Sequence, residues 1–156
     1  MREFLTVVLE TSQEVPFLVD ALEQTGLIRD GHVGIAGISQ GGFITYTAVT
    51  LEPRLKVAVS VVGSPRWALE LPESPHLHLG VFDCVFLLSR NATRDELVPS
   101  RDARDFHGRL GRFYPDHAAR FAYAEYASDH LLGAVWDVLW ARTLGWFGSH
   151  LGQSVT

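Results

Sequence analysis

Apolar residues along the chain form short continuous runs that alternate with segments of helical periodicity. Four runs are short, rich in β-branched or aromatic residues and bounded by turn signals, so we expect them to be strands. Strands that are apolar along their whole length are buried on both faces, which favours a mostly parallel sheet flanked by helices, an α/β fold. The predicted strands are residues 32–38, 55–62, 81–88 and 121–126, the first preceded by the turn signal Asp30-Gly31.

The start of the chain supports two interpretations. Residues 4–9 could be a strand, because of their β-branched content, or the first turns of a helix. Thr11 and Glu14 have the spacing of a capping box, which favours a helix start at that point, and Pro16 is tolerated only near such a start. Gly26 is the expected helix stop.

Three further helices are expected, at residues 43–51, 100–110 and 130–147. Glu52-Pro53 should end the first of them, because the residue before a proline disfavours the helical conformation. In the last one, Leu139, Trp136 and Trp140 recur at the spacing of a buried face, so we expect this stripe to be core. Residues 66–80 follow Pro65, contain two further prolines and are expected to form a loop with at most one helical turn.

Composition limits the class of protein. With 156 residues and 47% hydrophobic residues, the chain suits one globular domain over residues 1–156, with no separate lid domain. Its only cysteine, Cys84, cannot form a disulfide within the chain, which fits a cytoplasmic location. The apolar run near the N-terminus is too short for a secretory signal, and no run reaches membrane-spanning length. We therefore expect no membrane partner.

Charge argues against a nucleic-acid partner. The net charge is −5, and the one arginine cluster, in residues 101–112, is interleaved with Asp102 and Asp105. A nucleic-acid-binding surface needs a stripe of Lys and Arg. The interleaved pattern instead indicates a solvated helix face.

A Gly-x-Ser-x-Gly segment, Gly37 to Gly41, stands where the first predicted strand ends and a helix begins. In that context the motif is typical of a nucleophile elbow, with Ser39 as the nucleophile. The glycines on either side should permit the sharp turn. The backbone N–H of Gln40 should then point at a developing oxyanion. The plain alternative is that Ser39 only caps a tight strand–helix turn.

A serine hydroxyl needs a base, and the base needs a group that orients it. Asp95 follows the third predicted strand and His130 the fourth, so both should lie at the edge of the sheet where Ser39 lies. The chain order Ser, Asp, His is that of α/β-hydrolases. Glu96 should point elsewhere, and Asp129 is expected to be a surface carboxylate.

The remaining histidines suggest no metal. His76 and His78 form a His-x-His pair, but no acidic or cysteine partner has ligand spacing, so a solvated loop pair is expected. His107 and His117 are expected at the surface. We predict neither a cofactor nor a metal.

The chain resembles the α/β-hydrolase superfamily, in particular the small bacterial esterases near dienelactone hydrolase and the prolyl-oligopeptidase catalytic domain. Three segments carry the resemblance: residues 13–16 (Gln-Glu-Val-Pro), the strand and elbow at 30–42, and residues 95–99 (Asp-Glu-Leu-Val-Pro). It implies Ser39 as nucleophile, Asp95 as acid and His130 as base. The sequence departs from the family in having Asn91-Ala92 where His-Gly usually precedes the acid.

The resemblance also implies an N-terminally truncated α/β-hydrolase fold, because the family's first strands and their oxyanion loop have no counterpart before residue 33. The strand at 32–38 would then have an open edge, unless residues 4–9 fold back onto it as a strand. An open apolar edge invites pairing, so we expect a homo-oligomer or a partner that is a separate N-terminal piece.

The leading hypothesis is a serine hydrolase that cleaves small carboxylic esters through an acyl-enzyme on Ser39. Two alternatives stay open: a catalytically weak or inactive remnant that acts through association, and a small-peptide hydrolase of the same superfamily. The intact order of Ser39, Asp95 and His130 favours an enzyme, whereas the missing oxyanion loop favours the remnant.

Overall fold

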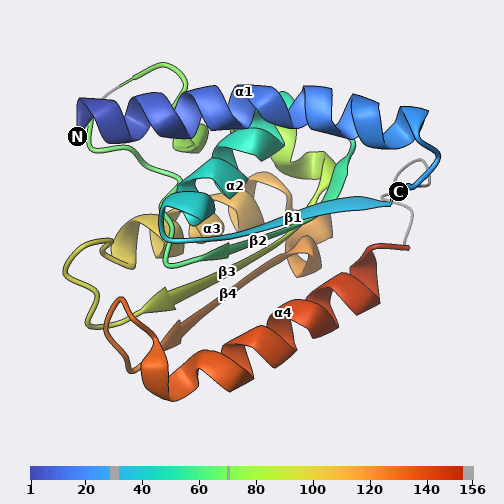
Figure 1. The fold of residues 1–156 in the computed structure, drawn as a ribbon. Helices are drawn as coiled ribbons and strands as arrows, with labels where there is room; N and C mark the ends of the chain where they lie inside the picture. The colour runs from blue at the N-terminus through green and yellow to red at the C-terminus, as the bar shows by residue number, and fades with distance from the viewer. Residues whose placement is uncertain (29–31, 70, 153–156) are drawn as a thin grey trace.

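The computed structural model describes residues 1–28, 32–69 and 71–152. Its centre is a four-stranded sheet in the order β1-β2-β3-β4, with every neighbouring pair parallel (Figure 1). The strands are β1 (Val33–Ile38), β2 (Leu55–Val61), β3 (Phe86–Ala92) and β4 (Phe121–Tyr126). The α/β fold and the parallel sheet expected from alternating strands and helices are confirmed. The predicted turn at Asp30-Gly31 lies outside the described residues.

The third strand begins later than the sequence pattern predicts. Residues Leu79–Cys84 form a 3₁₀ helix, and β3 begins only at Phe86. Phe82 of this 3₁₀ helix is fully buried in the core. A short apolar run fits a buried strand and a buried helical turn equally well, because periodicity alone does not separate the two.

Helices cover both faces of the sheet (Figure 1). On one face lie α2 (Gln40–Leu51) and α3 (Arg101–Phe113), which share an apolar cluster with Ala58 and Leu87. On the other face lies α4 (Trp136–His150), whose Leu139 packs against alternate residues of the same strands. The two central strands therefore contribute side chains to two cores, which explains the continuous apolar runs.

The helix α1 (Arg2–Gln24) forms a further layer on the outside of α2 (Figure 1). The predicted start at the Thr11–Glu14 capping box is wrong, as is the strand alternative for residues 4–9. Pro16 lies inside the helix, where a proline removes one backbone hydrogen bond. Buried contacts of Leu5 and Val8 with Trp67 stabilise the N-terminal half of the helix and outweigh the weak local signal.

A second correction concerns the last helix, which begins at Trp136 rather than at residue 130. Leu139 is buried as expected, but Trp136 and Trp140 are 41% and 48% exposed and stack on each other. The tryptophan that anchors α4 is Trp146, whose indole N–H donates a hydrogen bond to the Phe86 carbonyl at 3.1 Å. His130 therefore lies in the loop after β4, outside the helix.

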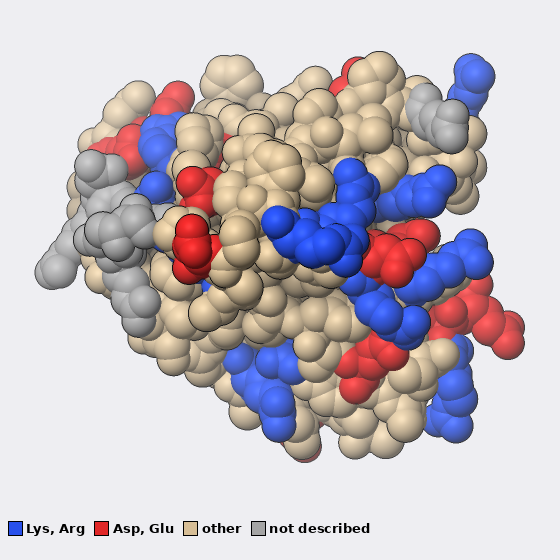
Figure 2. All heavy atoms as spheres, turned by 180° about the vertical axis from the view of Figure 1, so that it is seen from behind, with Lys and Arg blue, Asp and Glu red and all other residues tan. Residues whose placement is uncertain are grey.

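The surface carries charges of both signs. Figure 2 shows the face opposite to the view of Figure 1. On this face basic and acidic side chains lie next to one another rather than in a patch of one sign. Arg104 and Glu125 form one such ion pair. No helix among the described residues is long and apolar enough to cross a membrane.

Within the described residues, β1 pairs only with β2 and forms one edge of the sheet. Ile38, at the end of this strand, is 42% exposed. The open edge expected from the sequence is thus present in this part of the chain. Whether a second copy or a separate N-terminal piece pairs with it stays a prediction.

The expectation that His107 is a surface residue is wrong. Its ring is buried in the core beneath β3, where Nε2 lies 2.7 Å from Ser89 Oγ and the Ser89 hydroxyl lies 2.5 Å from that of Tyr46. Burial lowers the pKa of His107 to about 3, because a charged imidazole would lose its hydration there. The ring is therefore neutral in the folded protein at physiological pH.

This burial predicts an acid-labile fold. In the unfolded chain His107 takes up a proton near the usual histidine pKa of 6.5, whereas the folded chain does not until about pH 3. The contribution of the neutral ring to the free energy of unfolding is therefore fully present above pH 6.5. Below that pH it falls by about 1.4 kcal/mol per pH unit, down to about pH 3. Urea unfolding from about pH 7 to 4 measures this slope, and His107→Gln should flatten it. Equal slopes in the two proteins would contradict the prediction.

Candidate active site

The turn between β1 and α2 holds Ser39 in an unusual backbone conformation, with φ 54° and ψ −115°. A non-glycine residue adopts a positive φ only under constraint. Here the constraint comes from both sides: the Ser39 N–H donates to the Val61 carbonyl at 2.8 Å, and the Ser39 carbonyl accepts from Gly42 N–H at 2.8 Å. The serine side chain therefore projects beyond the carboxyl end of β1, toward the loop that holds His130.

The two glycines of the motif are not equivalent. A Cβ on Gly37 would lie 2.0 Å from the Gly41 carbonyl oxygen, so a side chain there is incompatible with this turn. A Cβ on Gly41 would meet nothing within 4 Å, so the expectation that both glycines are needed sterically holds only for Gly37. A further close approach, between Gly42 and Gly63, brings α2 against the loop after β2.

Replacing each glycine by alanine should separate these roles. Gly37→Ala should lower the free energy of unfolding by about 1–3 kcal/mol or more, because the turn must open to admit the methyl group. Gly41→Ala should be neutral or stabilising by up to about 1 kcal/mol, because alanine is the better helix former. Urea unfolding midpoints of the two variants provide the measurement. A similar loss in both would show that the contact at Gly37 is not the constraint.

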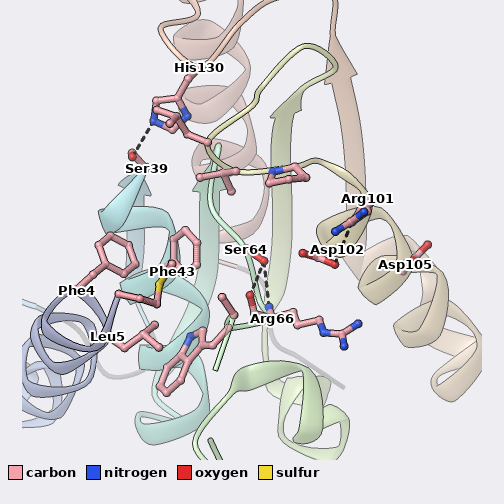
Figure 3. Close-up of a pocket in the computed structure, with 16 residues that line it drawn as sticks. Phe4, Leu5, Ser39, Phe43, Ser64, Arg66, Arg101, Asp102, Asp105 and His130 are labelled. Atoms are coloured by element: carbon pink, nitrogen blue, oxygen red, sulfur yellow. Dashed lines mark hydrogen bonds and ion pairs between the residues drawn. The ribbon is translucent and has the colours of Figure 1, made fainter. Parts of the chain in front are cut away.

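Three predicted site residues come together at the carboxyl edge of the sheet. Ser39 Oγ lies 2.8 Å from His130 Nε2, and His130 Nδ1 lies 2.7 Å from Asp95 Oδ2 (Figure 3 draws the first contact). The three come from the loops after β1, β3 and β4, which run parallel and so end at the same edge. The separations are those of a nucleophile, a base and the group that orients the base.

The Asp95 carboxylate is fully buried and held by its own loop. Its Oδ1 accepts hydrogen bonds from the N–H groups of Leu97 and Val98, at 3.0 and 2.9 Å. Those bonds leave Oδ2 for His130, so the carboxylate fixes the orientation of the imidazole. Of the competing carboxylates, Asp129 is exposed, as expected, and Glu96 is exposed as well.

Gln40 is the first residue of α2. The first N–H groups of a helix have no acceptor within it and lie at its positive end. The Gln40 N–H is therefore suited to a negatively charged oxygen next to Ser39, and its role as oxyanion donor stays a prediction. A second oxyanion donor stays unassigned among the described residues.

Ser39 and His130 open into a cavity of about 800 Å³. One wall is apolar and comes from α1, α2 and the loop after β2, and Figure 3 shows Phe4, Leu5 and Phe43 on the side of Ser39 that faces away from His130. The opposite wall carries charged side chains of both signs. They are Arg66 in the loop after β2, and Arg101, Asp102 and Asp105 of α3.

Sequence reasoning missed this lining. The motif predicts a nucleophile at Ser39, but nothing in the sequence shows that the first turn of α1 lies against α2. There the rings of Phe4 and Phe43 meet edge to face, with their centroids 5.1 Å apart. The arginines and aspartates of α3 have the spacing of a solvated helix face, which is all that their pattern predicts. Only the fold shows that some of them border the cavity.

The His-x-His pair is bonded to protein groups. His76 Nδ1 lies 2.8 Å from Ser74 Oγ, and His78 Nε2 lies 2.6 Å from the Pro72 carbonyl oxygen. Burial and the nearby Arg66 lower the pKa of His76. Among the described residues no group of three or more His, Cys, Asp or Glu side chains could hold a metal ion.

Known proteins of similar sequence and similar structure identify the fold. The "Putative esterase YitV" of Bacillus subtilis (strain 168) is 26% identical over 178 residues, covering 95% of this chain and 69% of the relative. A puromycin-hydrolyzing peptidase of Mycobacterium tuberculosis superposes with a TM-score of 0.66 at 22% identity, and a thermostable esterase with 0.67 at 17%. The chain has an α/β-hydrolase-type fold. No family model matches it.

The α/β-hydrolase-type fold is shortened relative to these neighbours. The superpositions cover 85% and 87% of this chain but only 24% of the peptidase and 35% of the esterase. The predicted resemblance is confirmed at the level of fold, and the chain spans only part of the length of these neighbours.

Proposed function

We propose that the chain is a serine hydrolase of the carboxylesterase type, with Ser39 as nucleophile, His130 as base and Asp95 as the group that orients His130. The observation that carries the proposal is the continuous set of contacts from Ser39 Oγ through the imidazole to a fully buried carboxylate. Similar proteins whose names include esterase support a hydrolase function in general.

The proposed reaction has two halves. In the first, His130 Nε2 accepts the Ser39 hydroxyl proton while Oγ attacks the ester carbonyl, and the Gln40 N–H donates to the developing oxyanion. The carbon–oxygen bond to the alcohol then breaks as His130 returns the proton to that oxygen, which leaves an acyl group on Ser39. In the second half, a water molecule gives a proton to His130 while its oxygen attacks the acyl carbon. The bond between that carbon and Ser39 Oγ then breaks, His130 returns the proton to Oγ, and the acid leaves.

The test of Ser39 uses a second serine that contacts a histidine, Ser89, as its matched control. Ser89 Oγ lies 2.7 Å from His107 Nε2, a contact as short as that of Ser39, but the pair is buried in the core. A fluorophosphonate probe should therefore label the wild type and Ser89→Ala but not Ser39→Ala. Hydrolysis of short aryl esters should fall by at least about 10³-fold in Ser39→Ala. Unchanged hydrolysis or labelling in that variant would remove Ser39 from the reaction.

Asp95 and His130 should act as one unit with Ser39. Asp95→Asn should lower kcat by about 10³- to 10⁴-fold, because the amide no longer orients the imidazole for proton transfer. The double variant Ser39→Ala, His130→Ala should be no slower than the slower single variant. The matched controls are Glu96→Gln and Asp129→Asn, each of which replaces an exposed neighbouring carboxylate and should keep wild-type kcat. Additive losses, or an equal loss in Glu96→Gln, would contradict the assignment.

A small-peptide hydrolase is the second candidate, and one observation favours it: the M. tuberculosis protein of similar fold is named a peptidase. The charges of Arg66, Arg101, Asp102 and Asp105 on one wall of the cavity would suit a peptide with charged ends. The same set Ser39, His130 and Asp95 would serve both reactions. Comparing kcat/KM for an ester and an amide of the same acyl group distinguishes them.

A further inference from the structure

A second hollow, of about 510 Å³, lies beside the cavity at Ser39 and runs along α1. We call it the α1 groove. Leu5 and Trp67 line both spaces, so the groove and the cavity adjoin at these two side chains. Leu5 and Trp67 are each only 3% exposed and belong to one apolar cluster, so they form a packed apolar boundary between the groove and the cavity. The other residues of the groove are Arg2, Thr6, Leu9, Leu69 and Leu71.

The lining of the α1 groove is that of a hydrocarbon site. Its walls are mainly leucine and tryptophan, and among the described residues Arg2 is the one charged residue that lines it. Leu9, Leu69 and Leu71 are only half-buried, so the groove leaves apolar surface in contact with water. Covering that surface with an aliphatic chain is favourable, because it removes apolar area from water on both partners.

The position of His130 indicates which end of an ester reaches the groove. His130 must give a proton to the leaving alcohol, so the alcohol lies on its side of Ser39. Figure 3 shows Phe4, Leu5 and Phe43 on the opposite side of Ser39. The acyl part of the ester is therefore directed along this wall. From Leu5 to Leu9 the wall continues for about 6 Å, one turn of helix.

We propose that the α1 groove binds the aliphatic chain of the acyl group, so that the preferred substrates are esters of medium-chain carboxylic acids. This inference rests on the proposed function, since it assumes acyl transfer to Ser39. The aliphatic chain would pass the apolar wall at Phe4 and Phe43, continue over the boundary that Leu5 and Trp67 form, and end over Leu9. The charged wall of α3 plays no part in this binding.

The experiment measures kcat/KM for p-nitrophenyl esters from acetate to decanoate. Each methylene that enters the groove should raise kcat/KM by about fourfold, until the groove is full. A second series of acetate esters with alcohols of increasing length should show no such rise. A steady fall from acetate onward, with acetate hydrolysed well, would overturn the inference while leaving the proposed function intact.

Thr6→Trp is the test variant, because Thr6 is exposed, lines the groove and can carry a ring that fills it. The ratio of kcat/KM for decanoate to that for acetate should fall at least about tenfold. Because both rates come from one preparation, the ratio does not depend on the folded fraction. The matched control is Val7→Trp, which puts the same ring on the next residue of α1, 45% exposed and lining neither space. It should keep the wild-type ratio.

The remaining outcomes are distinct. Equal ratios in the two tryptophan variants, or a Thr6→Trp effect confined to the alcohol series, would overturn the assignment of the groove to the acyl chain. No hydrolysis of any ester, together with no labelling of Ser39 by a fluorophosphonate, would contradict the proposed function and this inference with it.

Discussion

The close contact between Gly37 and the first turn of α2 is the constraint on which the site depends. With no side chain at Gly37, the Gly41 carbonyl can lie where a Cβ would otherwise stand, and the chain reverses within two residues. That reversal forces Ser39 to a positive φ and sets Gln40 at the start of a helix. The strain at Ser39 is held by backbone hydrogen bonds to β2 and α2, so it is supported by the sheet itself.

Parallel strands provide the second half of the arrangement. Because β1, β3 and β4 all end at one edge, three loops far apart in sequence meet there without any long excursion of the chain. The loop after β3 then buries Asp95 by giving its carboxylate two backbone N–H donors, which offset the loss of water. A buried, bonded carboxylate is a rigid support, whereas His130, 18% exposed, is open to the cavity.

Features encoded in local sequence were predictable, and features set by tertiary packing were not. The strand at 121–126 and the end of α2 at Glu52-Pro53 follow from turn signals and apolar runs, and the meeting of Ser39, Asp95 and His130 follows from their places after strands. The 3₁₀ helix at Leu79–Cys84 and the burial of His107 depend on which neighbours cover those residues. The continuity of α1 through Pro16 likewise depends on its contacts with α2 and Trp67 rather than on its own propensity.

The same helix α1 links these points to specificity. Met1 and Phe4 at the start of α1 border the cavity into which Ser39 opens. An apolar wall there stabilises no charge, but it can hold a hydrocarbon chain and exclude water from the acyl group. In the proposed reaction, binding energy gained along this wall would position the ester carbonyl against Ser39, and positioning lowers the barrier to acyl transfer.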